Sequence, residues 1–203
     1  DSGTEADSAM FYSITNCQEG LRGISFGNLL IKQVAEELKR EFPHLRTFAT
    51  LSPIPGFRRW LDKTRVRLAI GPEGEQRLAL LARIEEPGWP QGEASEPLAQ
   101  LLLQLCAWYL LNAKKGEEPL DAVARFHLGN GAALERLNWL GDTSEQGMER
   151  SAGMMVNYVY RLGDVERNHE RYFRLHLVVA SRAIGKLARE CPLDGQATKR
   201  ADA

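Results

Sequence analysis

Two side chains in this 203-residue sequence combine a reactive group with a position at the edge of an apolar segment. His127 lies near the end of the apolar segment 121–128, just before the Gly-Asn-Gly turn at 129–131, where a loop could present its imidazole to a cleft for acid–base chemistry. Ser52 ends the apolar run LRTFATLS, where its hydroxyl could act as a nucleophile or a proton shuttle. The structural alternatives are a hydrogen-bonded core histidine and a turn-forming serine before proline. Spacing by itself favours those alternatives.

Other kinds of catalytic and metal site lack their sequence signatures. The sequence contains neither the GxSxG elbow of α/β-hydrolases nor an HExxH zinc motif, and its 27 acidic residues are spread over expected helix surfaces. The remaining histidines and the cysteines do not group into a metal-ligand pattern: His44, His169, His176, Cys17, Cys106 and Cys191. An odd number of scattered cysteines argues against a disulfide framework and against zinc, and a reducing compartment is the default.

A glycine-bearing loop precedes the first expected helix. Gly20, Gly23 and Gly27 fall within eight residues and adopt positive φ at little cost, so the backbone N–H groups of residues 22–28 could turn inward together. The helix follows at once with Asn28 as its N-cap, and the positive end of its dipole would point into the same cradle. Such a cradle suits a phosphate or a pyrophosphate. The alternative is a plain glycine-rich turn, because neither GxxxxGK[ST] nor GxGxxG spacing is present.

Periodicity places this loop in a strand–helix–strand unit. Residues 9–16 and 45–52 are strand-like, and the helix between them repeats apolar residues at three- and four-residue steps over residues 30–42. A crossover of this kind belongs to the α/β class and puts its binding site beyond the carboxyl ends of the strands. Pro55-Gly56 suits the two central positions of a type II turn.

The remaining elements alternate between helices and strands. In chain order we expect short helices and loops over 61–96, a helix over 98–113, a helix or a strand over 121–128, strands over 132–141 and 153–162, and a long helix over 166–189. The last strand is rich in β-branched and aromatic residues, and its Val156, Tyr158 and Tyr160 share one face. A layer of helices is therefore expected beside the sheet.

Charge and hydropathy argue against two classes of partner. The net charge is −1 and the isoelectric point is near 6.5, so the chain has no positive field to hold a polyanion such as nucleic acid. The longest apolar run, residues 97–111, is too short for a bilayer and contains two glutamines. The first nine residues are polar and acidic and lack the layout of a secretory signal. Neither nucleic acid nor a membrane is therefore an expected partner.

Four segments together resemble the malonyl-CoA decarboxylase family: YSITNCQEGLRGISFGN, TLSPIPGF, RFHLGNGA and MVNYVY. They follow one another in the family's order from about Met10 to Ala188, so the resemblance covers nearly the whole chain. It implies the GNAT acyl-CoA fold, an α/β (α+β) arrangement with a mixed sheet flanked by helices, here without its first strands. The implied organisation is a flexible polar lead over 1–9, a catalytic domain over 10–190 with a helical insertion at about 61–120, and a polar tail over 191–203.

The resemblance also implies which residues form the site. It places coenzyme A on seven loop residues: Arg22, Gly23, Ile24, Ser25, Phe26, Gly27 and Asn28. Ser25 stands where the usual loop has a glycine and where some relatives have a carboxylate. The resemblance assigns catalysis to Ser52 and His127, and Ser13 and Tyr160 match positions that support the site. No metal, biotin, pyridoxal or other cofactor is implied, because coenzyme A is part of the substrate.

The implied reaction converts malonyl-CoA to acetyl-CoA and carbon dioxide. Loss of carbon dioxide leaves a thioester enolate, so the site must stabilise an oxyanion and then protonate carbon. Two alternatives share the fold, namely a GNAT acyltransferase and a non-catalytic acyl-CoA sensor. The resemblance further implies that this chain is the C-terminal part of a longer protein, and that a helical domain ahead of it supports a homo-oligomer. A cytoplasmic location is expected, because the family's peroxisomal relatives end in SKL and this chain ends in ADA.

Overall fold

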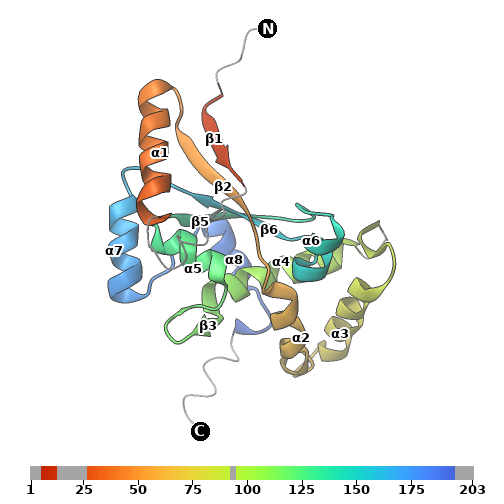
Figure 1. Ribbon diagram of the computed structural model, residues 1–203. Coiled ribbons are helices and arrows are strands. Elements are labelled where there is room, and N and C mark those ends of the chain that lie inside the picture. The colour runs from red at the N-terminus through yellow and green to blue at the C-terminus, as the bar shows by residue number, and fades with distance from the viewer. Residues whose placement is uncertain (1–5, 13–26, 92–94, 195–203) are drawn as a thin grey trace, which may run out of the picture.

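The computed structural model describes residues 6–12, 27–91 and 95–194. The elements are, in order, β1 (Ser8–Phe11), α1 (Gly27–Glu41), β2 (Thr47–Pro53), α2 (Phe57–Leu68), α3 (Gly74–Ala82), α4 (Ser95–Asn112), β3 (Lys114–Lys115), β4 (Glu118–Pro119), α5 (Ala122–Gly129), β5 (Ala133–Asn138), α6 (Glu145–Ser151), β6 (Met155–Val159), α7 (Val165–Leu175) and α8 (Arg182–Arg189). Short 3₁₀ helices at Arg83–Glu85 and Trp89–Gln91 lie between α3 and α4. Figure 1 shows the longer strands crossing the middle of the molecule with helices around them.

The predicted strand–helix–strand unit consists of β1, α1 and β2. β1 pairs with β2 in parallel, and Phe11 lies opposite Thr50. The amphipathic helix α1 packs Ile31 into the core and Leu38 against it, as its apolar spacing predicts, and it also buries Ala35. Val34 and Phe42, which the same spacing placed on the packed face, are exposed, so that part of the prediction is wrong. Because Phe11 is the last residue of β1, the carboxyl end of that strand lies next to the part of β2 that carries Ser52.

The four-stranded sheet is mixed and runs in the order β1-β2-β6-β5. β6 pairs antiparallel with both β2 and β5. In the β2/β6 pairing, Thr50 lies opposite Tyr158 and Ser52 opposite Val156. Since side chains alternate between the two faces of a sheet, these four side chains share one face, and all of them are buried. Tyr160 follows Tyr158 by two residues and is buried as well.

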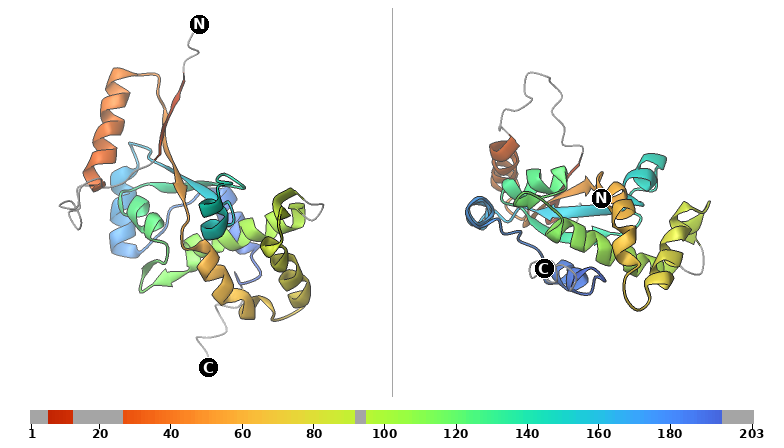
Figure 2. Two further views of the ribbon diagram at one scale, coloured as in Figure 1. Left: turned by 45° about the vertical axis from the view of Figure 1, so that its right-hand side comes forward. Right: turned by 90° about the horizontal axis from the view of Figure 1, so that it is seen from below.

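α4 lies at the centre of a helical layer, as its apolar composition predicts. Leu102, Leu105 and Leu110 are fully buried, and the helix packs against α2, α3 and α8. Stacked indole rings join α4 to α2, with the ring centroids of Trp60 and Trp108 5.7 Å apart. Figure 2 shows α4 beside α2 and α3. None of the described helices combines the length and the apolar character of a membrane span.

Residues 121–128, which fit a helix or a strand, contribute to the helix α5. Asp121 caps this helix, because its Oδ1 accepts a hydrogen bond from the Ala124 N–H at 2.9 Å. Gly131 then turns the chain toward β5 with a φ of +79°. A Cβ at this position would lie 2.1 Å from the carbonyl oxygen of Val165. The cap and the glycine turn together hold α5 beside the sheet.

The long final helix expected over 166–189 is wrong, because α7 and α8 divide this segment. His176 ends α7 in the left-handed conformation with a φ of +50°. The chain then runs along β5, where the Leu134 N–H donates to the Val179 carbonyl at 2.9 Å and the Ser181 N–H donates to the Leu134 carbonyl at 2.8 Å. The edge of β5 thus supplies backbone partners that the helical periodicity of this segment does not reveal.

Pro55-Gly56 forms a type I turn, so the expected type II turn is wrong. Gly56 has a φ of −92° and a ψ of −10°, and the Phe57 N–H donates to the Ile54 carbonyl at 3.2 Å. A Cβ on Gly56 would lie 2.4 Å from the hydroxyl oxygen of Tyr109. Glycine is therefore required here by close packing against α4 and not by a positive φ.

We expect Gly131→Ala to destabilise the protein by about 3 kcal/mol or more, because left-handed strain adds to a clash with the Val165 carbonyl. Gly116→Ala is the matched control, since Gly116 also has a positive φ, of +65°, but faces open space. Its expected cost is about 1 kcal/mol. Denaturant unfolding measures the free energy of unfolding of both variants. Equal losses of this free energy would show that the contact with Val165 contributes nothing.

Candidate active site

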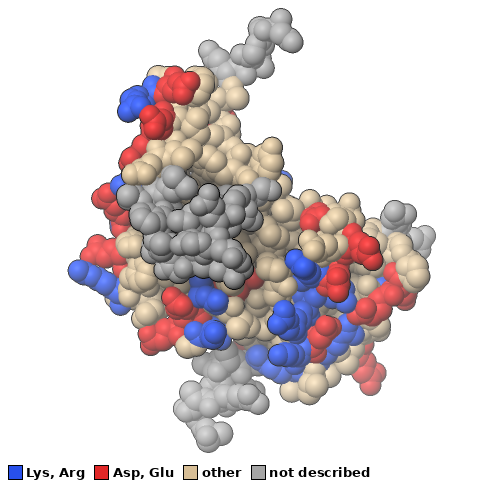
Figure 3. Space-filling view, viewed as in Figure 1, with Lys and Arg blue, Asp and Glu red and all other residues tan. Residues whose placement is uncertain are grey.

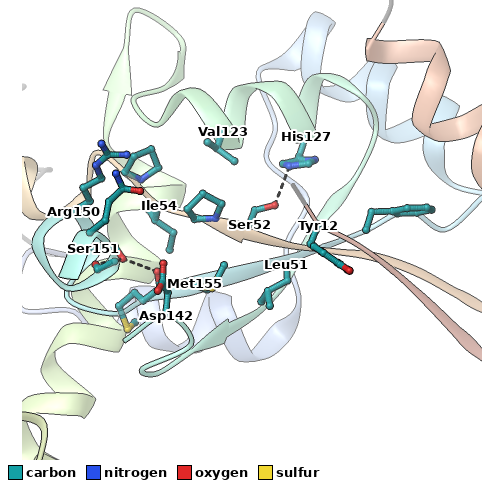
Figure 4. A pocket seen from close by; sticks show the side chains of 16 residues that line it. Tyr12, Leu51, Ser52, Ile54, Val123, His127, Asp142, Arg150, Ser151 and Met155 are labelled. Carbon is teal, nitrogen blue, oxygen red and sulfur yellow. Dashed lines mark hydrogen bonds between the residues drawn. The ribbon is translucent and has the colours of Figure 1, made fainter. Parts of the chain in front are cut away.

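Ser52 and His127 lie together although 75 residues separate them in the chain. The Oγ atom of Ser52 is 3.1 Å from Nε2 of His127, and the residues are only 4% and 3% exposed. Ser52 comes from β2 and His127 from α5. Figure 4 shows the two side chains pointing toward one another. The contact on which the predicted catalytic pair depends is therefore present, and the roles of the two residues in catalysis stay a prediction.

Two tyrosines hold the imidazole of His127 in place. The hydroxyl oxygen of Tyr160 is 2.8 Å from Nδ1. The ring of Tyr158 stacks on the imidazole, with centroids 4.4 Å apart and an interplanar angle of 23°. Each ring nitrogen thus has a hydroxyl partner and one ring face is covered. These contacts orient Nε2 toward Ser52.

Tyr160, His127, Ser52 and Thr50 form a hydrogen-bonded cluster in which each residue donates to the next in that order. Burial raises the pKa of Tyr160, so its hydroxyl keeps its proton, and donating that proton to Nδ1 satisfies both buried groups. A neutral His127 then carries its own proton on Nε2 and donates it to the Ser52 oxygen. The Ser52 hydroxyl in turn donates to Oγ1 of Thr50 at 3.0 Å. The hydrogen-bond network thus assigns the tautomer of His127.

Burial lowers the pKa of His127 to about 4, because its surroundings disfavour an imidazolium ion. In the part of the chain that the structure describes, both ring nitrogens contact hydroxyl groups and not carboxylates. The ring is therefore neutral near pH 7. A neutral imidazole beside a hydroxyl can donate a hydrogen bond to a developing oxyanion or exchange a proton with the hydroxyl.

A cavity of about 730 Å³ opens beside this cluster, and Ser52 and His127 form part of its wall. This volume lies within the range of small-molecule sites, roughly 300 to 1,000 Å³. Phe11 and Tyr12, at the carboxyl end of β1, also line the cavity. Apolar side chains form much of the remaining wall: Leu51, Ile54, Val123, Met154 and Met155. The cavity therefore offers a small reactive centre within largely apolar surroundings.

Part of the predicted site lies outside the described residues. This holds for Ser13 and for Arg22, Gly23, Ile24, Ser25 and Phe26, whose predicted roles stay predictions. Gly27 and Asn28 belong to the first turn of α1, which begins one residue ahead of the expected N-cap. Within residues 6–12, 27–91 and 95–194, no group of three or more His, Cys, Asp or Glu side chains is placed to hold a metal ion.

Thr50 and Tyr158 are members of the cluster that the sequence analysis did not assign to the site. The alternation of side chains along a strand could have identified both residues. Thr50 precedes Ser52 by two residues and Tyr158 precedes Tyr160 by two, so each lies on the same face as a predicted site residue. Strand periodicity therefore identifies candidate neighbours of a predicted site residue.

The family model described as the malonyl-CoA decarboxylase C-terminal domain matches residues 1–202. The chain belongs to the malonyl-CoA decarboxylase family. The mitochondrial malonyl-CoA decarboxylases of Anser anser anser and Rattus norvegicus are each 38% identical to it, over 195 and 198 residues. These matches cover 87% of this chain and only 39% and 40% of those two proteins, so the chain spans less than half of their length.

Crystal structures of malonyl-CoA decarboxylase from Rhodopseudomonas palustris and Agrobacterium vitis are similar to this chain, each with a TM-score of 0.82. Their sequences are 50% and 48% identical to it, over 90% of this chain and over 42% and 46% of theirs. This similarity confirms the predicted fold class, a mixed sheet flanked by helices. The predicted domain limits and the expected further strands stay predictions.

The buried imidazole predicts a pH dependence of stability. The pKa of His127 falls from 6.5 in the unfolded chain to about 4 in the folded protein, so its contribution is present above pH 6.5 and is lost as the pH falls toward 4. The free energy of unfolding should lose about 3 kcal/mol more across this window in the wild type than in His127→Gln. Urea titrations at several pH values measure the difference. Parallel stability profiles would contradict a neutral buried ring.

Proposed function

We propose that this chain, as part of the malonyl-CoA decarboxylase family, converts malonyl-CoA to acetyl-CoA and carbon dioxide. The observation that carries the proposal is the buried 3.1 Å contact between Ser52 and His127 on the wall of the cavity. Family membership supports the identity of the substrate. The contact between Ser52 and His127 supports the chemistry, because an imidazole and a hydroxyl can deliver a proton to carbon.

The coenzyme A part of the substrate is proposed to bind where β1 ends and α1 begins. Tyr12 follows β1 and lines the cavity, and α1 begins at Gly27. The N-terminal amides and the dipole of a 15-residue helix favour a phosphate at that end. These features support the predicted contact of residues 22–28 with the pyrophosphate. The acyl end of the substrate would then extend along β2 toward Ser52.

Decarboxylation breaks the bond between the α-carbon and the carboxylate. Carbon dioxide leaves, and the electron pair of that bond moves into the thioester as an enolate. The Ser52 hydroxyl can turn from Thr50 to the enolate oxygen, and the hydrogen bond from Nε2 of His127 supports it as a donor. The α-carbon then takes the Nε2 proton of the neutral His127, directly or through Ser52, which leaves the negative charge on the imidazole. Water returns a proton to Nε2 and becomes hydroxide, so the charge of the lost carboxylate leaves the site as hydroxide.

The apolar wall of the cavity assists the loss of charge from the departing carboxylate. Leu51, Ile54 and Val123 line the same cavity as the Ser52–His127 pair. Because carbon dioxide is neutral, surroundings that solvate a carboxylate poorly raise the energy of the substrate more than that of the transition state. The same surroundings keep His127 neutral, so one apolar environment serves both the leaving group and the proton donor.

We expect Ser52→Ala and His127→Gln each to lower kcat/KM for malonyl-CoA by about 10²- to 10⁴-fold, because each removes a proton-bearing group from the reacting centre. The measurement is the rate of acetyl-CoA formation together with release of carbon dioxide. His44→Gln, on the exposed surface after α1, is the control and should retain the wild-type rate. Wild-type activity in both site variants would refute the assignment of the site.

We expect Tyr160→Phe to lower kcat about tenfold with little change in KM. The substitution removes one hydrogen bond worth about 1 kcal/mol, and without it the proton of His127 is no longer held on Nε2. Steady-state kinetics with malonyl-CoA measures both constants. Tyr172→Phe makes the same substitution in α7, outside the cavity, and serves as the control. A tenfold rise in KM at constant kcat would show that Tyr160 acts on binding instead.

The two alternative activities predict different results in one experiment. An acyltransferase would leave malonyl-CoA intact until an amine acceptor is added. An acyl-CoA sensor would bind malonyl-CoA without turnover and would be indifferent to Ser52→Ala. Incubation of the protein with malonyl-CoA alone separates the decarboxylase from both alternatives, because only the decarboxylase releases carbon dioxide without an acceptor. Addition of an amine then separates the acyltransferase, which transfers the acyl group, from the sensor, which does not.

Malonyl-CoA is the partner that this proposal requires. Homo-oligomerisation and a cytoplasmic location stay predictions, and the two animal relatives carry the word mitochondrial in their names. Light scattering of the purified protein tests the first of these predictions, and microscopy of the tagged protein in its own cells tests the second.

A further inference from the structure

Arg150 is a cation on the wall of the cavity that Ser52 and His127 share. It lies in the last turn of α6, far along the chain from either residue. Among the cavity-lining residues that the structure describes, Arg150 is the one lysine or arginine and Asp142 is the one carboxylate. The reaction proposed above gives Arg150 no part in the chemistry, so its position requires another explanation.

Within the described ranges, no carboxylate lies within ion-pair distance of Arg150. The carboxylate of Asp142 is engaged elsewhere, because its Oδ1 accepts a hydrogen bond from the Ser144 N–H at 3.0 Å. Basic side chains also gather on the surface over α2 (Figure 3), but Arg58 and Arg65 there both donate to Glu85. The guanidinium of Arg150 is thus available to an anionic ligand of the cavity.

The backbone that carries Arg150 is held firmly. Ser144 caps α6, its Oγ accepting a hydrogen bond from the Gly147 N–H at 3.1 Å. A Cβ on Gly147 would lie 2.4 Å from Cγ of Asp142, so the helix packs tightly on the turn before it. The buried Ser151 donates its hydroxyl to the Gly147 carbonyl at 3.0 Å. The Cα and Cβ atoms of Arg150 are therefore fixed relative to the cavity.

The order of residues along the cavity indicates which part of an acyl-CoA Arg150 would meet. Figure 4 shows Tyr12 on one side of Ser52 and Arg150 on the other. Tyr12 leads to the segment proposed to hold the pyrophosphate, and Ser52 lies where the thioester would react. A substrate that enters past Tyr12 and places its thioester at Ser52 points the far end of its acyl group toward Arg150.

We propose that Arg150 is a specificity-determining residue that binds the free carboxylate of the acyl group and so selects dicarboxylic acyl-CoA thioesters over neutral ones. The inference rests on the proposed function and adds to it the group that distinguishes substrate from product. A guanidinium and a carboxylate form a charge-assisted hydrogen bond, whereas the methyl group of acetyl-CoA gains nothing from Arg150. Arg150 therefore contributes to binding of the substrate and permits release of the product.

The test compares the affinities of malonyl-CoA and acetyl-CoA by calorimetry. Ser52→Ala is used as the parent so that malonyl-CoA is consumed only slowly during the titration, and Arg150→Gln is added to it. We expect Kd for malonyl-CoA to rise about tenfold, because an exposed ion pair is partly screened by water, while Kd for acetyl-CoA changes less than about twofold. Arg150→Lys keeps the charge and should recover part of the lost affinity.

Arg59→Gln in the same parent is the matched control. Arg59 is an exposed arginine of α2 that lines a neighbouring hollow of about 390 Å³ and is absent from the wall of the main cavity. It should leave the ratio of the two Kd values unchanged. If Arg150→Gln raised Kd equally for malonyl-CoA and acetyl-CoA, the proposal would be overturned, because the guanidinium would then contact a phosphate of coenzyme A. An unchanged Kd for both thioesters would overturn it as well.

The readout is separate from that of the proposed function. If the wild-type protein releases no carbon dioxide, decarboxylation is refuted, whereas the difference in affinity between the two thioesters can still be measured. If carbon dioxide is released, Arg150→Gln in the otherwise wild-type protein should raise KM for malonyl-CoA about tenfold and change kcat less than about twofold. A loss confined to kcat would contradict a role in recognition.

Discussion

Burial of a neutral imidazole is the constraint on which the site depends. A polar ring in apolar surroundings is stable only when its nitrogens have hydrogen-bond partners, and here Tyr160 and Ser52 supply them while Tyr158 covers a ring face. Thr50 continues the series by accepting from Ser52. The β2/β6 register places the strand members of this cluster on one sheet face. A shift of one residue would turn those side chains to the opposite face.

The cavity separates selection of the substrate from its reaction. The chemistry is assigned to Ser52 and His127, which are buried, uncharged and surrounded by apolar walls that favour loss of a carboxylate's charge. The proposed recognition is assigned to Arg150, which is exposed and carries a permanent charge. The carboxylate that Arg150 is proposed to bind is also the one that leaves as carbon dioxide. The ion pair with Arg150 would therefore stabilise the bound substrate, whereas the apolar surroundings of Ser52 favour the transition state, in which that charge is being lost.

Local patterns predicted most of the elements that build the site. The helix α1, the β2 strand before Ser52 and the common face of Val156, Tyr158 and Tyr160 all depend on neighbours within a few residues, and the structure confirms these elements. The four ordered motifs indicated the family, which the family model shows. Residue type and spacing did not decide between a catalytic and a structural role for Ser52 or His127, since both roles accept the same local sequence.

Contacts between distant segments were decided only by the tertiary structure. The final helix breaks at His176 because the edge of β5 offers backbone partners, and position 56 requires a glycine because Tyr109 of α4 packs against it. Neither partner is near in sequence. The pairing of Ser52 with His127, and the burial that keeps the imidazole neutral, arise in the same way. The sequence by itself determined the family and most of the elements, because periodicity records local interactions. Packing between distant segments determined the tautomer and the pKa of His127 and the place of Arg150 on the cavity wall.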